Sequence, residues 1–171
     1  LDATSGFIKA GAGTLTLSGP NTYPGTTTVN AGVGGLKFTT APSFTTFTGN
    51  GTVELNLGVT VSLAGTFGSG FTGQINVAGA GTVLSTAGSS VMSANLGDVY
   101  IVTGATLTIN NSTVQVDELT GPGSVATTFV VNPAFPTLVL GANNGNGTNA
   151  EFSGPVTSGL NNWIGIVKNG T

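Results

Sequence analysis

The chain has 171 residues, of which only 5% are charged, compared with roughly 25% in ordinary globular proteins. The formal net charge is −3 and the basic residues are Lys9, Lys37 and Lys168 alone, too few for the basic patch that a nucleic-acid binder or a polybasic membrane anchor needs. Cysteine, histidine and arginine are absent, so the chain has no disulfide framework and lacks the preferred ligands of zinc and copper.

The composition favours an all-β fold. Hydrophobic residues make up 39% of the chain, there are 29 glycines, and threonine is abundant. Apolar residues and threonine favour strands, whereas glycine and asparagine favour turns. The chain has no apolar run of about 18 residues or more, so we expect no transmembrane helix.

Short strands are expected wherever apolar and polar residues alternate with a period of two. In chain order, this alternation occurs at residues 14–18, 52–57, 59–63, 74–77, 106–110 and 113–117. The segment "SVMSANL" at 90–96 lacks it and is predicted to form one helical turn or a corner loop. Five phenylalanines that lie close together in the sequence are interpreted as stacked core residues: Phe38, Phe44, Phe47, Phe67 and Phe71.

A loose phrase recurs along the chain, consisting of a glycine turn, a threonine and then alternating apolar residues. It reads "GAGTLTL" at 11–17, "GNGTVEL" at 49–55, "GAGTVLS" at 79–85 and "TGATLTI" at 103–109. The copies of the phrase are separated by roughly 24 to 38 residues, a range typical of solenoid repeats. A recurring phrase indicates a solenoid because stacked rungs meet the same environment at every turn. We therefore predict a parallel β-helix (β-solenoid) of roughly seven to nine rungs of about 20 residues each. The alternative is an antiparallel β-sandwich, which also has short strands between frequent turns.

The segment "GFIKAGAGTLTLSGPNTYPGTTTVNAG" at residues 6–32 resembles the autotransporter-associated β-strand repeat, also called the passenger-associated transport repeat. That repeat has a glycine, two apolar residues and a lysine, then G-x-G-T-L-x-L-x-G and then N-T-Y-x-G-x-T-x-V-x-x-G. The match runs through Lys9, Gly11, Gly13, Thr14, Leu15, Leu17, Gly19, Asn21, Thr22, Tyr23, Gly25, Val29 and Gly32. The resemblance implies a right-handed parallel β-helical passenger of a secreted or surface-exposed protein of Gram-negative bacteria. It implies a structural, secretion-linked role and no catalytic residue.

The end of the chain, "GIVKNGT" at 165–171, looks like the start of a second copy, with Lys168 standing 159 residues after Lys9. We expect residues 1–171 to be a single β-solenoid module, in which 6–32 is one autotransporter-type repeat and 165–171 begins another. A β-helix without caps leaves strand edges open at both ends, and open edges recruit further strands. The predicted partners are therefore copies of the same chain, joined head to tail in a filament or a tandem array.

Five residues near the two ends are the candidate axial-junction or ligand contacts: Trp163, Ile164, Ile166, Phe7 and Ile8. A junction is the favoured interpretation of Trp163, since aromatic residues are enriched at interfaces. The alternative is that Trp163 forms a platform for a surface glycan.

The inventory of reactive side chains argues against catalysis. The acids, Asp2, Glu54, Asp98, Asp117, Glu118 and Glu151, are scattered. Only Asp117 and Glu118 adjoin, and neighbours on a strand point to opposite faces. Without histidine, cysteine or arginine, the usual bases, nucleophiles and oxyanion clamps are missing. We predict no catalytic, cofactor-binding or metal site, and a solvated loop is favoured over a weak calcium site at the adjoining pair.

The resulting prediction is a non-catalytic extracellular or cell-surface structural protein, the building block of a surface fibre, a matrix filament or a passenger stalk. An adhesin or a carbohydrate-binding surface module is the alternative.

Overall fold

The computed structural model describes residues 5–22, 25–32, 34–42, 46–62, 66–85, 92–110, 113–127, 136–141, 151–158 and 164–169. Among these residues there is no helix, and every pair of neighbouring strands is parallel. The all-β parallel solenoid is therefore confirmed, and the antiparallel sandwich is wrong.

The strands form four parallel sheets. The first contains β1 (Phe7–Lys9), β3 (Thr27–Val29), β5 (Thr46–Gly49) and β8 (Thr66–Phe71). The second contains β2 (Leu15–Leu17), β4 (Gly35–Phe38), β6 (Thr52–Asn56), β9 (Gln74–Ala78), β12 (Asp98–Ile101) and β15 (Leu119–Thr120). The third contains β7 (Thr60–Ser62), β10 (Val83–Ser85), β13 (Thr106–Ile109), β16 (Ser124–Thr127) and β18 (Val156–Ser158). The fourth contains β11 (Met92–Leu96), β14 (Thr113–Val116), β17 (Thr137–Leu140) and β19 (Gly165–Lys168).

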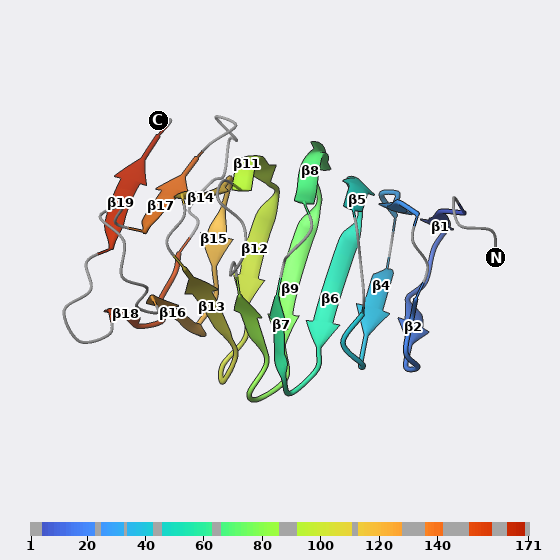
Figure 1. Ribbon diagram of the computed structural model, residues 1–171, viewed down its shortest axis with the longest axis horizontal. Coiled ribbons are helices and arrows are strands. Elements are labelled where there is room, and N and C mark those ends of the chain that lie inside the picture. Colours follow the sequence, from blue (N-terminus) through green and yellow to red (C-terminus); the bar gives the residue numbers. More distant parts are fainter. Residues whose placement is uncertain are drawn as a thin grey trace.

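The chain winds around one axis, because successive strands belong to different sheets and most strands pair with their equivalent one turn later. Phe7 aligns with Thr27 and Thr27 with Phe47, so each of these turns takes 20 residues. Figure 1 shows the strands progressing along the long axis, with the two ends of the chain at opposite ends of the molecule. The predicted seven to nine rungs are not confirmed, since the longest described sheet has six strands. The right-handed sense of the coil stays a prediction.

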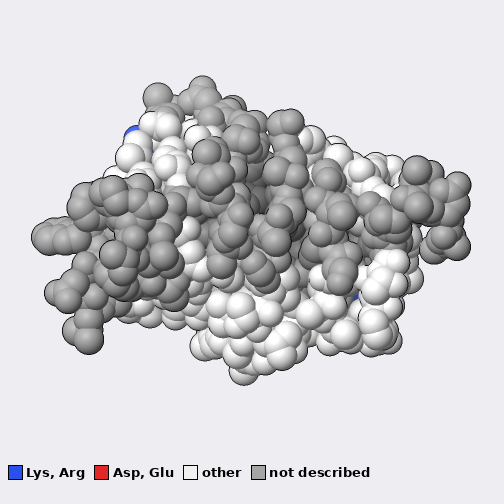
Figure 2. All heavy atoms as spheres, in the orientation of Figure 1, with Lys and Arg blue, Asp and Glu red and all other residues white. Residues whose placement is uncertain are grey.

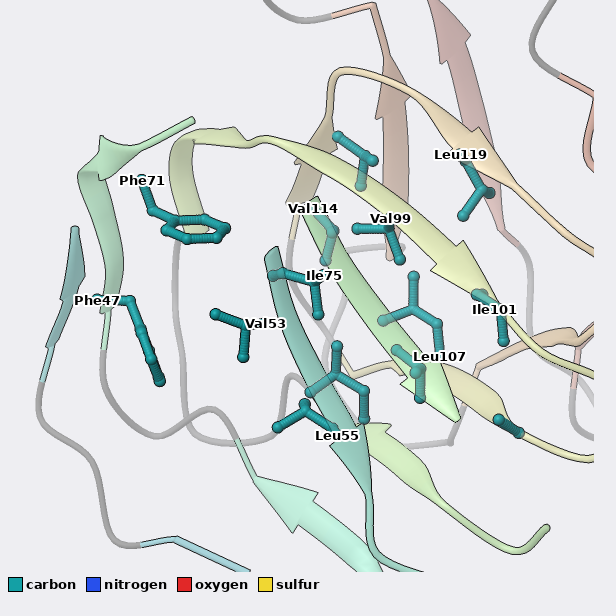
Figure 3. Close-up of a cluster of buried hydrophobic side chains, with 14 of the residues drawn as sticks. Phe47, Val53, Leu55, Phe71, Ile75, Val99, Ile101, Leu107, Val114 and Leu119 are labelled. Atoms are coloured by element: carbon teal, nitrogen blue, oxygen red, sulfur yellow. The ribbon is translucent and has the colours of Figure 1, made fainter. Parts of the chain in front are cut away.

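The core is a set of aliphatic columns inside the coil. In the second sheet Val53, Ile75 and Val99 follow one another in register, and all three are fully buried. Figure 3 shows these side chains beside Leu107 and Val114, which come from the third and fourth sheets. Every second residue of a strand points inward, so the alternation seen in the sequence is the alternation between the core and the outside.

Three aromatic residues pack together in the N-terminal half of the core. Phe38, Phe47 and Phe71 are buried, and their rings meet edge to face. The ring centroids of Phe38 and Phe47 are 6.4 Å apart, and those of Phe47 and Phe71 are 6.2 Å apart. The predicted core role is confirmed for these three residues, although the rings do not stack face to face. Phe44 and the side chain of Phe67 lie outside the described residues.

Polar side chains on neighbouring rungs form hydrogen bonds with each other. Thr28 and Thr48 are aligned on neighbouring strands, and their hydroxyl oxygens are 2.9 Å apart. The Nδ2 of Asn110 donates to the Oγ of Ser85 at 3.0 Å. Neutral side chains that both donate and accept can repeat at every rung without the repulsion that like charges would create.

The prediction of a helical turn or corner loop at 90–96 is wrong for its described part. Met92–Leu96 is strand β11, which pairs with β14 in a parallel register that shifts between Met92 and Leu96. The local sequence lacks alternation, but the hydrogen-bonding edge of the adjacent rung selects the extended backbone. Tertiary pairing thus overrides local propensity.

Candidate interaction surfaces at the two ends of the solenoid

The first end, the N-terminal end face, is formed by β1 and β2, each of which pairs on one side only among the described residues. Leu15 is aligned with Leu36, and Leu17 with Phe38, both fully buried. Leu15 therefore occupies a core position, yet 38% of its surface is exposed. Exposure at this position means that no described rung lies beyond it.

Lys9 completes the N-terminal end face. It is aligned with the fully buried Val29 and is itself buried. Its Nζ donates to the carbonyl oxygens of Gly11 at 2.9 Å and of Ala10 at 3.3 Å. The aliphatic stem thus covers the core while the ammonium group binds the carbonyls of the two residues that follow it in the chain. This geometry explains why a lysine follows two apolar residues in the repeat.

The opposite end, the C-terminal end face, is formed by β18 and β19. Ile166 is aligned with Leu138 and Val156 with Val125, and both of these inner partners are buried. Ile166 is nevertheless 54% exposed and Val156 41% exposed. Both side chains continue core columns that no described residue covers.

The two lysines of the end strands make similar contacts. The Nζ of Lys168 donates to the carbonyl oxygen of Asn169 at 2.6 Å, as the Nζ of Lys9 does to the carbonyl of the residue that follows it. Both lysines are the last residue of their strand. Strands β1 and β19 thus share a sequence pattern and a local hydrogen bond.

The five predicted contact residues lie in different environments. Phe7 and Ile164 are half-buried and pack against the core, whereas Ile8 is 68% exposed and lies on the outer side of β1. Ile166 lies on the C-terminal end face, and Trp163 is outside the described residues. Leu15 and Val156 were not predicted as end-face residues. The register aligns both residues with buried core residues of the adjacent strand. Only the structure shows that no further described rung covers them.

Charged side chains are sparse on the flanks. The face in Figure 2 shows small traces of blue and no red among the described residues. The Nζ of Lys37 forms an ion pair with the Oε1 of Glu54 at 2.8 Å. Burial raises the pKa of Asp98 above its ordinary value, and the nearby charges of Glu118 and Asp117 raise it further.

The described part of the chain contains no group of three or more histidine, cysteine, aspartate or glutamate residues placed to hold a metal ion. In the same residues no helix has the length and apolar character needed to cross a membrane.

Comparison with known proteins gives one match. The family model described as passenger-associated-transport-repeat matches residues 7–33, the segment that contains β1, β2 and β3. No curated protein and no solved structure matches the chain. The repeat and the solenoid fold fit an extracellular protein of the autotransporter-passenger type. The resemblance found in the sequence is thus confirmed: residues 7–33 match the passenger-associated-transport-repeat model, and β1 and β2 within this segment form the N-terminal end face of a parallel β-solenoid.

Proposed function

We propose that this chain is a non-catalytic structural module of a surface or secreted protein of Gram-negative bacteria, built to continue end to end into a longer rod. The observation that carries the proposal is that both end faces expose core positions. Leu15 lies at one end, and Val156 and Ile166 lie at the other. Apolar surface of this kind, next to strand edges with which no described strand pairs, favours association with another rung.

The occupant of each end face is a further copy of the same module. A partner rung would cover Leu15 or Ile166 with an aliphatic side chain and would extend the parallel sheets. In the first sheet, β3 pairs with β1 and places Val29 beside Lys9. Because β19 shares the sequence pattern of β1, the strand that pairs best with the open edge of β19 is one like β3, with a valine beside Lys168. This arrangement arises in a tandem array of modules.

Direct stacking of β1 from one copy on β19 of another is less favourable. It would place Lys9 and Lys168 on neighbouring strands, where like charges destabilise the pair. Separate chains should therefore associate weakly, and association should become stronger at higher ionic strength, because salt screens the repulsion and strengthens apolar burial.

A pair of end variants tests the head-to-tail geometry. Leu15→Lys blocks the N-terminal end face, and Ile166→Lys blocks the C-terminal end face. Wild-type protein should form particles that lengthen with concentration and salt in small-angle scattering and electron microscopy. Each variant alone should remain monomeric. An equimolar mixture of the two variants should stop at dimers, since each supplies one intact end.

The control is Val59→Lys, which places the same charge at an exposed valine on the flank between β6 and β7. This variant should associate like the wild type. Monomers of the wild type at every concentration and salt level would contradict the proposal, as would equal loss of association in all three variants.

The absence of catalysis is part of the proposal and is supported by the repeat and the fold, which are typical of non-enzymatic passengers. The alternative role in glycan adhesion, with Trp163 as the platform, stays a hypothesis because that residue lies outside the described part of the chain.

A further inference from the structure

A polar hollow lies on the outer side of the second sheet, away from the end strand β19. Its volume is about 280 Å³, and it lies over β4, β6 and β9. This volume is close to the lower end of the range of roughly 300–1,000 Å³ that is typical of small-molecule sites. The hollow therefore suits a small ligand.

The register brings the polar side chains of the hollow into two adjacent rows. In one row Lys37, Glu54 and Asn76 are aligned across three strands. In the other, Thr52 is aligned with Gln74. All five residues line the hollow, as does Gly34.

The hollow holds one positive and one negative side chain, and these neutralise each other. The Nζ of Lys37 lies 2.8 Å from the Oε1 of Glu54, and the Nδ2 of Asn56 donates to the same oxygen at 3.3 Å. An anionic ligand would meet the carboxylate, and a cationic ligand would meet the ammonium group. The remaining side chains in the lining that form hydrogen bonds are the amides of Gln74 and Asn76 and the hydroxyls of Thr14 and Thr52, which both donate and accept.

From this arrangement we propose that the hollow is a binding site for one unit of a neutral saccharide. Sugar hydroxyls donate to the carboxylate of Glu54 and to amide oxygens, and they accept from the ammonium group of Lys37 and from amide nitrogens. Charge-assisted hydrogen bonds of this kind give a neutral ligand both affinity and orientation. The site does not depend on end-to-end assembly.

Asn76 provides a second, independent observation. Its Oδ1 is buried and has no hydrogen-bond partner, although buried polar atoms are nearly always paired. The amide of Asn76 also lines the hollow. Rotation of this amide on binding brings the oxygen to a ligand hydroxyl and supplies the missing partner.

The site extends along the rod toward β12. Tyr100 follows Asn76 in register on the next strand and is 36% exposed. An exposed tyrosine presents a rigid apolar face with a polar tip, on which the ring of a second sugar unit can lie. A disaccharide that runs along the rod axis should therefore bind more tightly than a single sugar.

The test uses the full chain labelled with ¹⁵N and a panel of methyl glycosides of glucose, galactose, mannose and N-acetylglucosamine. Cellobiose and lactose serve as disaccharides, and galacturonate and glucosamine as charged controls. At least one neutral sugar should saturate, and the perturbed amide signals should cluster in β4, β6 and β9. This readout requires no variant, so it holds even if a substitution impairs folding.

Variants then identify the contacts. Gln74→Ala and Glu54→Gln should each weaken binding about tenfold, as expected for the loss of one or two hydrogen bonds. Gln115→Ala is the matched control, because Gln115 is also half-buried on a strand but belongs to the fourth sheet, and it should bind as the wild type does. Tyr100→Ala should remove the added affinity of a disaccharide and leave that of the methyl glycoside unchanged.

Several results would overturn the proposal. These are no saturable binding of any neutral sugar, tighter binding of a charged control, signal changes centred outside β4, β6 and β9, or equal weakening by Gln74→Ala and Gln115→Ala.

Discussion

At the scale of single residues, Asp98 is the group whose ionisation the fold disfavours. It is half-buried at the start of β12, and both its burial and the charges of Glu118 and Asp117 raise its pKa from the ordinary value of 3.8. The folded state therefore binds the proton more tightly than the unfolded state. With respect to this group, stability is highest below the ordinary pKa and is lost as pH rises through the raised pKa.

Asp98→Asn should remove this penalty. We expect the variant to be more stable than the wild type near neutral pH and to lose the decline in stability between the ordinary carboxyl pKa and neutrality. Urea unfolding across that pH range measures the effect. Glu151→Gln removes one charge from an exposed position and controls for net charge. An equal response in the two variants would mean that burial of Asp98 is not the cause.

At the scale of elements, the corner that leads into the second sheet depends on a column of glycines. Gly51, Gly73 and Gly97 precede β6, β9 and β12. The amide of Gln74 donates to the carbonyl of Gly51 at 3.2 Å, and that of Asp98 donates to the carbonyl of Gly73 at 3.1 Å. The backbones approach so closely here that a side chain has no space.

Gly73→Ala should destabilise the protein by about 1–3 kcal/mol or more, as overpacking does. The added Cβ would collide with the carbonyl oxygen of Gly51 and would lie 2.8 Å from the carbonyl carbon of Asn50. Both are backbone atoms, so the clash cannot be relieved by a side-chain rotation. Thermal or urea unfolding measures the change.

Gly19→Ala is the matched control, because its Cβ would meet nothing within 4 Å. Its stability should stay within about 0.5 kcal/mol of the wild type. Similar losses at both positions would show that close packing at the corner is not what requires glycine.

At the scale of the whole molecule, each rung contacts only its neighbours, so stability should vary along the axis. Strands β6, β9 and β12 have a rung on both sides, whereas β1 and β19 pair on one side only among the described residues. Rungs at the ends can open without disturbing the centre. The rod should therefore unfold locally from its ends.

Hydrogen exchange followed by mass spectrometry tests this expectation. Amides of β6, β9 and β12 should exchange slowest, and those of β1 and β19 fastest. In associated wild-type particles the end strands should gain protection, while Leu15→Lys should show no such gain. Uniform protection along a monomeric chain would contradict the expectation.

The sequence by itself determined the fold class and the repeat. Alternating aliphatic and polar residues, glycine turns and sparse charge are local features, and each acts in the same way wherever the strand lies. The strands expected at 52–57, 74–77 and 106–110 are found as β6, β9 and β13. The residues at fixed spacing in the N-terminal repeat likewise identified that repeat from the sequence alone.

Only the tertiary structure decided which residues share a surface. Turn lengths differ, since Leu36 aligns with Val53 after 17 residues and Ile75 with Val99 after 24. The register therefore cannot be read from a constant period. The register places Lys37, Glu54 and Asn76 in one row, leaves core residues uncovered at the two ends, and makes 92–96 a strand. Side chains far apart in the sequence meet because backbone pairing between rungs aligns them, and no local pattern encodes that alignment.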